Sequence, residues 1–236
     1  MASHDSLIHL HCGDASAVVH RRSGLPGSVR VCRDSPAVGP WTPDASQLPG
    51  LRAAWWGLPV EEAPAPLVLE DLGGVAEPVL WFGPDPWEQA CLLWILAALP
   101  EGTLSDLVPL DHSVAQLAPA TLPSLFAGRI LLEEDTLAQA RSLWGGFLEG
   151  GWRPLAGCGI PALPWLARAL ARLAEDHPVD GPGRTHRQIR GLVEQGVHGL
   201  PALMEALRRL EDPRHGVWYG DRFVTKMVES MEARLG

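Results

Sequence analysis

The chain has 236 residues, 46% of them hydrophobic, and a formal charge of −9 at pH 7, with 18 arginines but a single lysine, Lys226. This length suits one large domain or two small ones. Because no lysine precedes position 226, a Walker-type phosphate loop and a Schiff-base lysine are excluded from everything before it.

The charge is unevenly distributed along the chain. Residues 1–179 hold 10 arginines and 20 acidic residues, whereas residues 180–236 hold nine basic and eight acidic residues. An acidic body argues against wrapping of nucleic acid, since Lys and Arg dominate phosphate binding. The four cysteines form no C-x-x-C pair, and no signal peptide or membrane-length apolar stretch is evident. We therefore expect a cytoplasmic protein without membrane contact.

Short apolar runs alternate with helical patterns in the first half of the chain. The runs predict strands over 7–12, 29–32, 78–82 and within 104–110. The patterns between them predict a helical turn over 15–20 and helices over 51–56 and 87–99. This alternation is typical of a parallel α/β sheet, here a Rossmann-like one with flanking helices.

From about Pro119 the pattern becomes helical. We expect helices over 135–148, 163–175, 185–194, 200–210 and 223–234. A Gly/Pro-rich boundary at 179–183 predicts an α/β domain over 1–118, a helical connecting region over 119–178 and a C-terminal helical domain over 179–236. That last unit has helix-turn-helix proportions, and the run 216–221 would supply the strand of a winged helix.

Four aspartates, Asp14, Asp34, Asp85 and Asp111, follow the predicted strands. The carboxyl ends of parallel strands meet at one edge of a sheet, so these side chains would converge on a ligand-binding crevice. The alternative is that each serves a turn or a helix N-terminus, which are common places for aspartate. Asp85, followed by Pro86, is well suited to such an N-cap.

The loop Gly13-Asp14-Ala15-Ser16 opens the first helix with a flexible glycine, a carboxylate and a hydroxyl. Helix N-termini attract phosphate groups, although the full G-x-G-x-x-G fingerprint is absent. We expect Gly13, Asp14 and Ser16 to receive a small polar, phosphorylated or nucleotide-like ligand. Arg33, beside the end of the second strand, would pair with its anionic group.

Catalysis is a second question that the sequence leaves open. If the protein is an enzyme, we expect a hydrolase or transferase in which Asp34 and Asp85 are catalytic and Gln89 orients hydroxyl groups. Asp14 and Asp34 would hold a divalent metal as cofactor, in place of the missing lysine. His9 and His11 also have the spacing of metal ligands on one strand, but histidines satisfied within the sheet are the favoured interpretation.

The C-terminal unit carries the alternative function. Arg184, Arg187 and Arg190 would share one helix face and contact DNA or a protein partner, which makes the protein a regulator that senses a ligand. Acidic residues nearby dilute this positive face. A third possibility is a non-catalytic interaction adaptor.

Several motifs resemble a known family. The blocks are Leu10-His11-Cys12-Gly13-Asp14, then Arg33-Asp34 with Gly39-Pro40, then Leu80-Trp81-Phe82 with Asp85 and Trp87-Glu88-Gln89. In this order they resemble the bacterial family called domain of unknown function 1835. Gly183-Arg184-Thr185 and Tyr219-Gly220-Asp221 are similar to its partner, domain of unknown function 3658. Pro84 replaces the histidine expected before Asp85, and the resemblance implies no particular chemistry.

Overall fold

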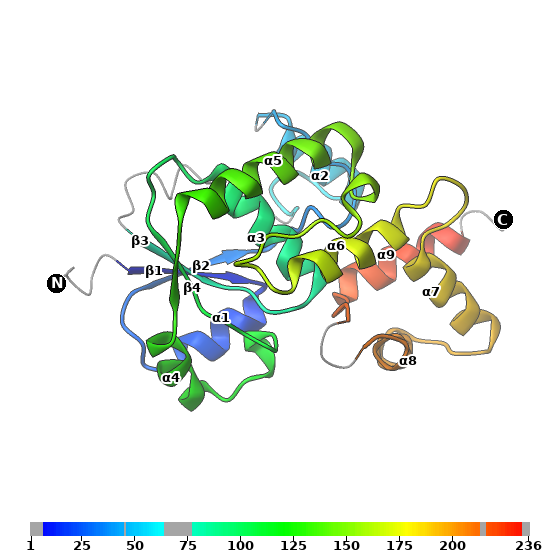
Figure 1. Ribbon diagram of the computed structural model, residues 1–236. Coiled ribbons are helices and arrows are strands. Elements are labelled where there is room, and N and C mark those ends of the chain that lie inside the picture. The colour runs from blue at the N-terminus through cyan, green and yellow to red at the C-terminus, as the bar shows by residue number, and fades with distance from the viewer. Residues whose placement is uncertain (1–6, 45, 64–76, 213–215, 233–236) are drawn as a thin grey trace.

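The computed structural model describes residues 7–44, 46–63, 77–212 and 216–232. Five strands form one sheet in the order β2-β1-β3-β4-β5 (Figure 1). Four of them run parallel, namely β1 (Leu7–Cys12), β2 (Ser28–Cys32), β3 (Glu77–Trp81) and β4 (Ser105–Leu107). β5 (Ile130–Leu132) is antiparallel to β4. The predicted α/β class and parallel strands are thus confirmed, although β4 is shorter than expected.

The sequence pattern did not predict β5. With three residues it is too short to show alternation, and its pairing with β4 is what defines it. Ile130 and Leu131 are exposed while Leu132 is buried, which is the pattern of an edge strand. The sheet therefore continues past residue 118, where we placed the end of the α/β domain.

Helices cover both faces of the sheet (Figure 1). One face carries α1 (Asp14–Arg21) and α4 (Leu122–Ala127). The other carries α3 (Pro86–Ala98) and α5 (Glu134–Gly150), with α2 (Leu48–Trp56) beside them. Short 3-10 turns follow at Val114–Gln116, Pro119–Thr121 and Arg153–Leu155. The result is a three-layer arrangement, which buries both faces of the parallel sheet.

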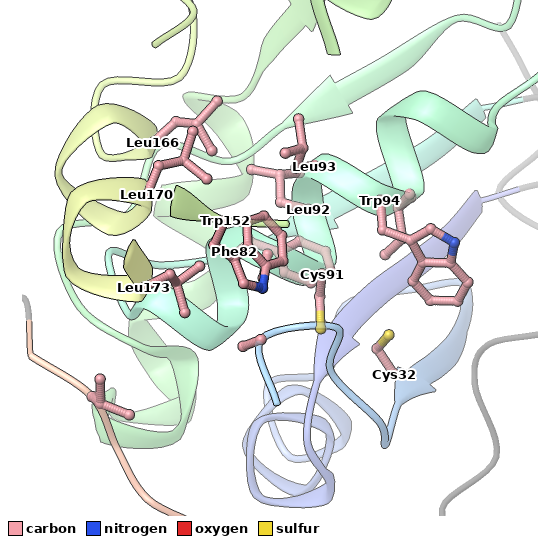
Figure 2. Close-up of a cluster of buried hydrophobic side chains, with 14 of the residues drawn as sticks. Cys32, Phe82, Cys91, Leu92, Leu93, Trp94, Trp152, Leu166, Leu170 and Leu173 are labelled. Carbon is pink, nitrogen blue, oxygen red and sulfur yellow. The ribbon is translucent and has the colours of Figure 1, made fainter. Parts of the chain in front are cut away.

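Helix α3 is the centre of the main core. Residues 88–96 are all buried, so this part of the helix is enclosed around its whole circumference, and seven of the nine side chains are apolar. Its side chains meet Leu166, Leu170 and Leu173 of α6 (Leu166–Asp176), and Trp152 closes the cluster (Figure 2). The tryptophan is held in place because its Nε1 donates to the carbonyl oxygen of Pro36, 3.1 Å away.

The C-terminal helices are α7 (Arg184–Glu194), α8 (Leu200–Leu210) and α9 (Asp221–Glu232). A buried guanidinium, that of Arg172 on α6, joins them by donating to Glu211 (2.7 Å), Thr185 (3.0 Å) and Tyr219 (3.0 Å). Residues 216–220 form no strand, so the predicted wing is not observed there. In the described part of the chain, the helices fall short of the length and apolarity needed to cross a bilayer.

The C-terminal unit packs directly on the α/β part. Val217, Tyr219 and Phe223 belong to the same hydrophobic cluster as α3. The ring of Trp87, in the first turn of α3, lies edge-on to Phe223 with centroids 5.0 Å apart. The first turn of α9 is thereby placed over the carboxyl end of the sheet.

Candidate functional site

A cavity of about 850 Å³ opens at the carboxyl ends of the parallel strands. Its walls come from the turns after β1, β2 and β3, from Ser113 beyond β4, and from Trp218 with residues 220–223. The chain runs from β1 to β2 on one side and returns to β3 on the other, which makes this the topological switch point of the sheet. Ligands of open α/β sheets bind at such crevices.

The cavity brings together six of the seven predicted α/β site residues. They are Gly13, Asp14, Ser16, Arg33, Asp34 and Asp85. The seventh, Gln89, is buried and lines a different cavity. The convergence of three of the four strand-end aspartates is therefore observed. Asp111 lies apart from them, in the cavity that Gln89 and Leu92 of α3 also line.

The N-terminus of α1 forms one wall. Gly13 has a φ of 77°, a conformation that favours glycine, and its N–H donates to the carbonyl oxygen of Cys32, 2.9 Å away. It provides no side chain to cap the helix, so the first-turn N–H groups lack both an intrahelical acceptor and a side-chain cap. The first turns of α3 and α9 reach the same cavity, and each adds the positive end of a helix dipole.

Arg33 and Asp14 form a bidentate ion pair at the mouth of the cavity. Arg33 Nε lies 3.0 Å from Asp14 Oδ2, and Nη2 lies 2.9 Å from Oδ1. Asp14 raises the pKa of Arg33, which keeps the guanidinium charged. The two side chains are 57% and 60% exposed, and exposed pairs stabilise a protein by at most about 1 kcal/mol. An anionic ligand can therefore compete with Asp14 for Arg33 at small cost.

Asp34 is engaged quite differently, although it is the next residue. Its oxygens accept from Arg52 Nη2 at 2.5 Å and Nε at 2.6 Å, and both side chains are fully buried. Arg52 also donates to the carbonyl oxygens of Val38 (2.5 Å) and Pro40 (3.1 Å). Burial raises the pKa of Asp34, while the ion pair opposes that shift. We assign Asp34 a positioning role, since both carboxylate oxygens hold the arginine that anchors the following loop.

Asp85 confirms the predicted N-cap of α3. Oδ1 accepts from the N–H groups of Trp87 (2.7 Å) and Glu88 (3.2 Å). Oδ2 accepts from the N–H of Trp218, 2.6 Å away and 133 residues later. The carboxyl is 4% exposed, and burial raises its pKa to about 7. Asp85 thus joins the α/β part to the segment before α9.

Glu88 is a site residue that the sequence pattern did not single out. Its Oε2 accepts from the N–H of Gly83 at 2.5 Å, and its side chain lines the cavity. Burial, with a smaller contribution from the charge of Asp85, raises the pKa of Glu88 to about 8. At neutral pH this carboxyl holds its proton, so it can donate one. The sequence does not predict this role for Glu88, because an acidic residue in the first turn of a helix is normally exposed.

Arg222 is the second residue that the pattern missed. It lies exposed in the first turn of α9 and lines the cavity on the side opposite the sheet. Within the described residues, no acid pairs with its guanidinium. Trp56, Trp87, Trp218 and Phe223 add aromatic surface to the same walls. The segment 216–221 suggested a wing by sequence, and only its packing on α3 makes it a wall of the cavity.

Cys12 and Cys32 line the cavity, and Cys91 lies buried behind them. Cys12 Sγ lies 3.9 Å from Cys91 Sγ, and Cys32 Sγ donates to the carbonyl oxygen of Asp34 at 3.6 Å (Figure 2 shows Cys32 and Cys91). Hydrogen bonding from Cys12 lowers the pKa of Cys91, while the pKa of Cys12 is raised by the same contact and by burial. All four cysteines are free thiols in this structure.

His9 and His11 face α1, on the other side of the sheet. His9 accepts from Trp81 Nε1 at 3.0 Å through Nδ1, so its Nε2 donates to the carbonyl oxygen of Pro26 at 2.9 Å. His11 Nε2 contacts His20 Nδ1 at 2.9 Å. His9 is therefore satisfied within the fold. Among the residues described, no three His, Cys, Asp or Glu side chains cluster in a way that could hold a metal.

The arginines of α7 are mostly engaged with neighbouring groups. Arg184 lies 2.7 Å from Glu175 and 3.5 Å from Glu211. Arg187 donates to the carbonyl oxygen of Pro182 at 2.5 Å, and Arg190 lies 3.9 Å from Glu194. Two of the three guanidinium groups are thus close to acids, and the contact with DNA or a protein partner stays a prediction.

Comparisons with protein-family models, curated proteins and solved structures each gave no match. The resemblance to the domains of unknown function therefore remains a prediction that rests on the quoted motifs. Their residues nevertheless occupy structurally decisive places. Each of the first three blocks contributes some of its residues to the cavity, and Thr185 and Tyr219 of the C-terminal motifs contact Arg172.

Proposed function

We propose that this protein binds a nucleoside- or nucleotide-like small molecule in the cavity at the carboxyl ends of β1, β2 and β3, on a Rossmann-like sheet. One observation supports this proposal: an uncapped helix N-terminus, an exposed arginine and several aromatic side chains line the same cavity. These groups match a phosphate and a planar ring joined by a hydroxyl-bearing sugar.

The anionic end of the ligand belongs at the first turn of α1. The free N–H groups after Gly13 and the guanidinium of Arg33 lie on the same wall. Arg33 would exchange its contact with Asp14 for a bidentate contact with phosphate, a charge-assisted hydrogen-bond geometry that arginine favours. Arg222, on the opposite wall, is a second cation within the same cavity.

The remaining walls suit the ring and the sugar. Trp87 and Trp218 line the cavity, where a base could stack on Trp87 or on the face of Trp218 that Arg208 does not cover. Base stacking on aromatic side chains is worth about 1–3 kcal/mol per base. Carboxylates on the walls, Glu62 and Asp221 among them, can accept hydrogen bonds from hydroxyl groups. These acids repel a highly charged ligand, so a single phosphate fits better than a triphosphate.

The expected metal site finds no support in the geometry. Asp34 has both oxygens on Arg52, and Asp14 is paired with Arg33. Arginine and backbone N–H groups would therefore neutralise the phosphate, in a chain that has a single lysine.

The test is calorimetric titration of the full chain with adenosine 5′-monophosphate and with adenosine. Arg33→Ala should weaken binding of the monophosphate by roughly 10- to 100-fold, as for loss of a charged hydrogen-bonding group, and leave adenosine binding unchanged. Arg187→Ala, an exposed arginine away from the cavity, is the matched control and should change neither. Equal losses for both ligands, or no binding of either, would reject the proposal.

A catalytic role is a second candidate, favoured by one observation. Glu88 lies at the cavity wall beside Asp85, and the pKa of its carboxyl is raised to about 8. A carboxylic acid that keeps its proton at neutral pH is suited to protonate a leaving group in hydrolysis or group transfer. Asp85 would be a positioning residue, since three backbone N–H groups occupy its oxygens.

This candidate is tested by following adenosine 5′-monophosphate with ³¹P and ¹H NMR in the presence of protein. Release of phosphate or adenine by the wild type, and its loss in Glu88→Gln with unchanged affinity, is the expected result. Glutamine still accepts from the N–H of Gly83, so the variant removes the proton and keeps the local contact. A ligand that stays intact would leave binding as the function.

A further inference from the structure

A second cavity, of about 400 Å³, lies on the other side of α3 and shares no wall residue with the first. It is bounded by Phe82 beyond β3, by Leu92 on α3, by residues 107–111, by Ile130 of β5 and by residues 162–165 before α6. This volume is within the range of pockets that hold small molecules.

The walls of this cavity are apolar and fixed. Phe82, Leu92, Leu107 and Leu163 are all buried. Trp165 Nε1 donates to the carbonyl oxygen of Leu110 at 2.6 Å, which ties the segment before α6 to the chain that leaves β4. Asp111 is the charged residue of the lining, and its side chain is 79% exposed. The charge therefore sits at the rim and leaves the interior neutral.

Gln89 is the polar residue of the buried wall. Its side chain is only 2% exposed, and Nε2 donates to the carbonyl oxygen of Gly83 at 2.7 Å. That carbonyl can only accept, so the amide nitrogen must face it and Oε1 must face away. Oε1 is buried and has no hydrogen-bond partner among the described residues. A buried acceptor without a partner is costly, and a ligand that donates to it removes this cost.

We propose that this cavity is a binding site for a small neutral molecule that has an apolar, ring-sized body and one N–H or O–H group. The body would occupy the space between Phe82, Leu92 and Leu163, and the donor would bond to Gln89 Oε1. Ile130 is 42% exposed at the rim, where an apolar ligand can enter. Gln89 thus keeps a ligand contact, as the sequence suggested, but in another cavity and independently of the function proposed above.

The site is tested with two probes of the same shape, indole and benzofuran, which differ in that only indole has an N–H donor. Titration of the full chain should show benzofuran binding roughly two- to tenfold more weakly, the net worth of one hydrogen bond. Amide chemical shifts in two-dimensional NMR should change around Gln89, Leu110 and Trp165. Equal affinity for both probes, or shifts that cluster elsewhere, would overturn the proposal.

Three variants complete the test. Gln89→Met removes the acceptor and should make the two probes bind equally well. Ala162→Phe fills the half-buried mouth of the cavity and should weaken both at least tenfold. Ala115→Phe places the same ring in the first cavity and should change neither. If Gln89→Met fails to fold for lack of the Gly83 contact, the probe pair and Ala162→Phe still decide, since unaltered binding by Ala162→Phe contradicts the site.

Discussion

Two neighbouring residues, Arg33 and Asp34, each form a bidentate arginine–aspartate pair, and the two pairs have opposite surroundings. Arg33 with Asp14 is more than half exposed, whereas Asp34 with Arg52 is fully buried. An exposed pair is solvated with or without its partner, so it exchanges easily. A buried pair that loses one member leaves an uncompensated charge. The same chemistry therefore gives a ligand contact in one place and a structural anchor in the other.

Replacement of Arg52 by Met should have the largest effect on stability. It leaves the carboxylate of Asp34 buried without a partner and frees the carbonyl oxygens of Val38 and Pro40. We expect the free energy of unfolding to fall by about 3–5 kcal/mol, measured by urea denaturation. Arg52→Lys should recover only part of it, because lysine cannot form the bidentate contact. A loss below 1 kcal/mol would mean that burial does not distinguish the two pairs.

His9, His11 and His20 form a histidine cluster that is buried without an opposite charge nearby among the described residues, unlike either arginine–aspartate pair. Burial lowers the pKa of His20 to about 4, and the pKa values of His9 and His11 are also lowered. The unfolded chain takes up these protons first, at about pH 6.5, so stability is present above that pH and is lost as pH falls. The contribution of His20 alone is about 3 kcal/mol between pH 6.5 and 4.

The measurement is urea denaturation of the wild type and of His20→Gln at several pH values from 7 to 4. The stability of the variant should fall less steeply with acid than that of the wild type. His177→Gln, a histidine outside the cluster, is the control and should follow the wild type. Parallel curves for His20→Gln and the wild type would show that the cluster does not control acid stability.

Replacement of Arg33 by Met should have the smallest effect on folding. Asp14 then faces solvent, and we expect a change of at most about 1 kcal/mol in the free energy of unfolding. The matched comparison is Arg52→Met in the same denaturation assay. A large loss for Arg33→Met would place this arginine with the structural anchors and remove it from the ligand site.

The candidate site was only partly accessible to prediction, and the reason differs from residue to residue. Gly13 and Asp85 can be recognised from their local sequence. Gly13 lies in a turn directly after a strand, and Asp85 is an N-cap followed by proline. Arg222 gives no such signal, because the packing of Phe223 on Trp87 is what brings it to the cavity. The choice between Arg33 as a ligand contact and Asp34 as an anchor depends on Arg52, 18 residues beyond the aspartate.

The sequence by itself determined the α/β class, the four parallel strands and most helix bounds. It also predicted that four aspartates converge at one edge, of which the structure brings together three. These follow from side-chain periodicity and from residues a few positions apart, which is where turns and caps are decided. Only the tertiary structure decided β5, the buried Glu88, the second cavity with Gln89, and the closure of the first cavity by α9. Each of these depends on contacts between distant segments, such as Trp218 with Asp85. For the carboxyls of Asp85 and Glu88, burial by those segments is the largest cause of the raised pKa.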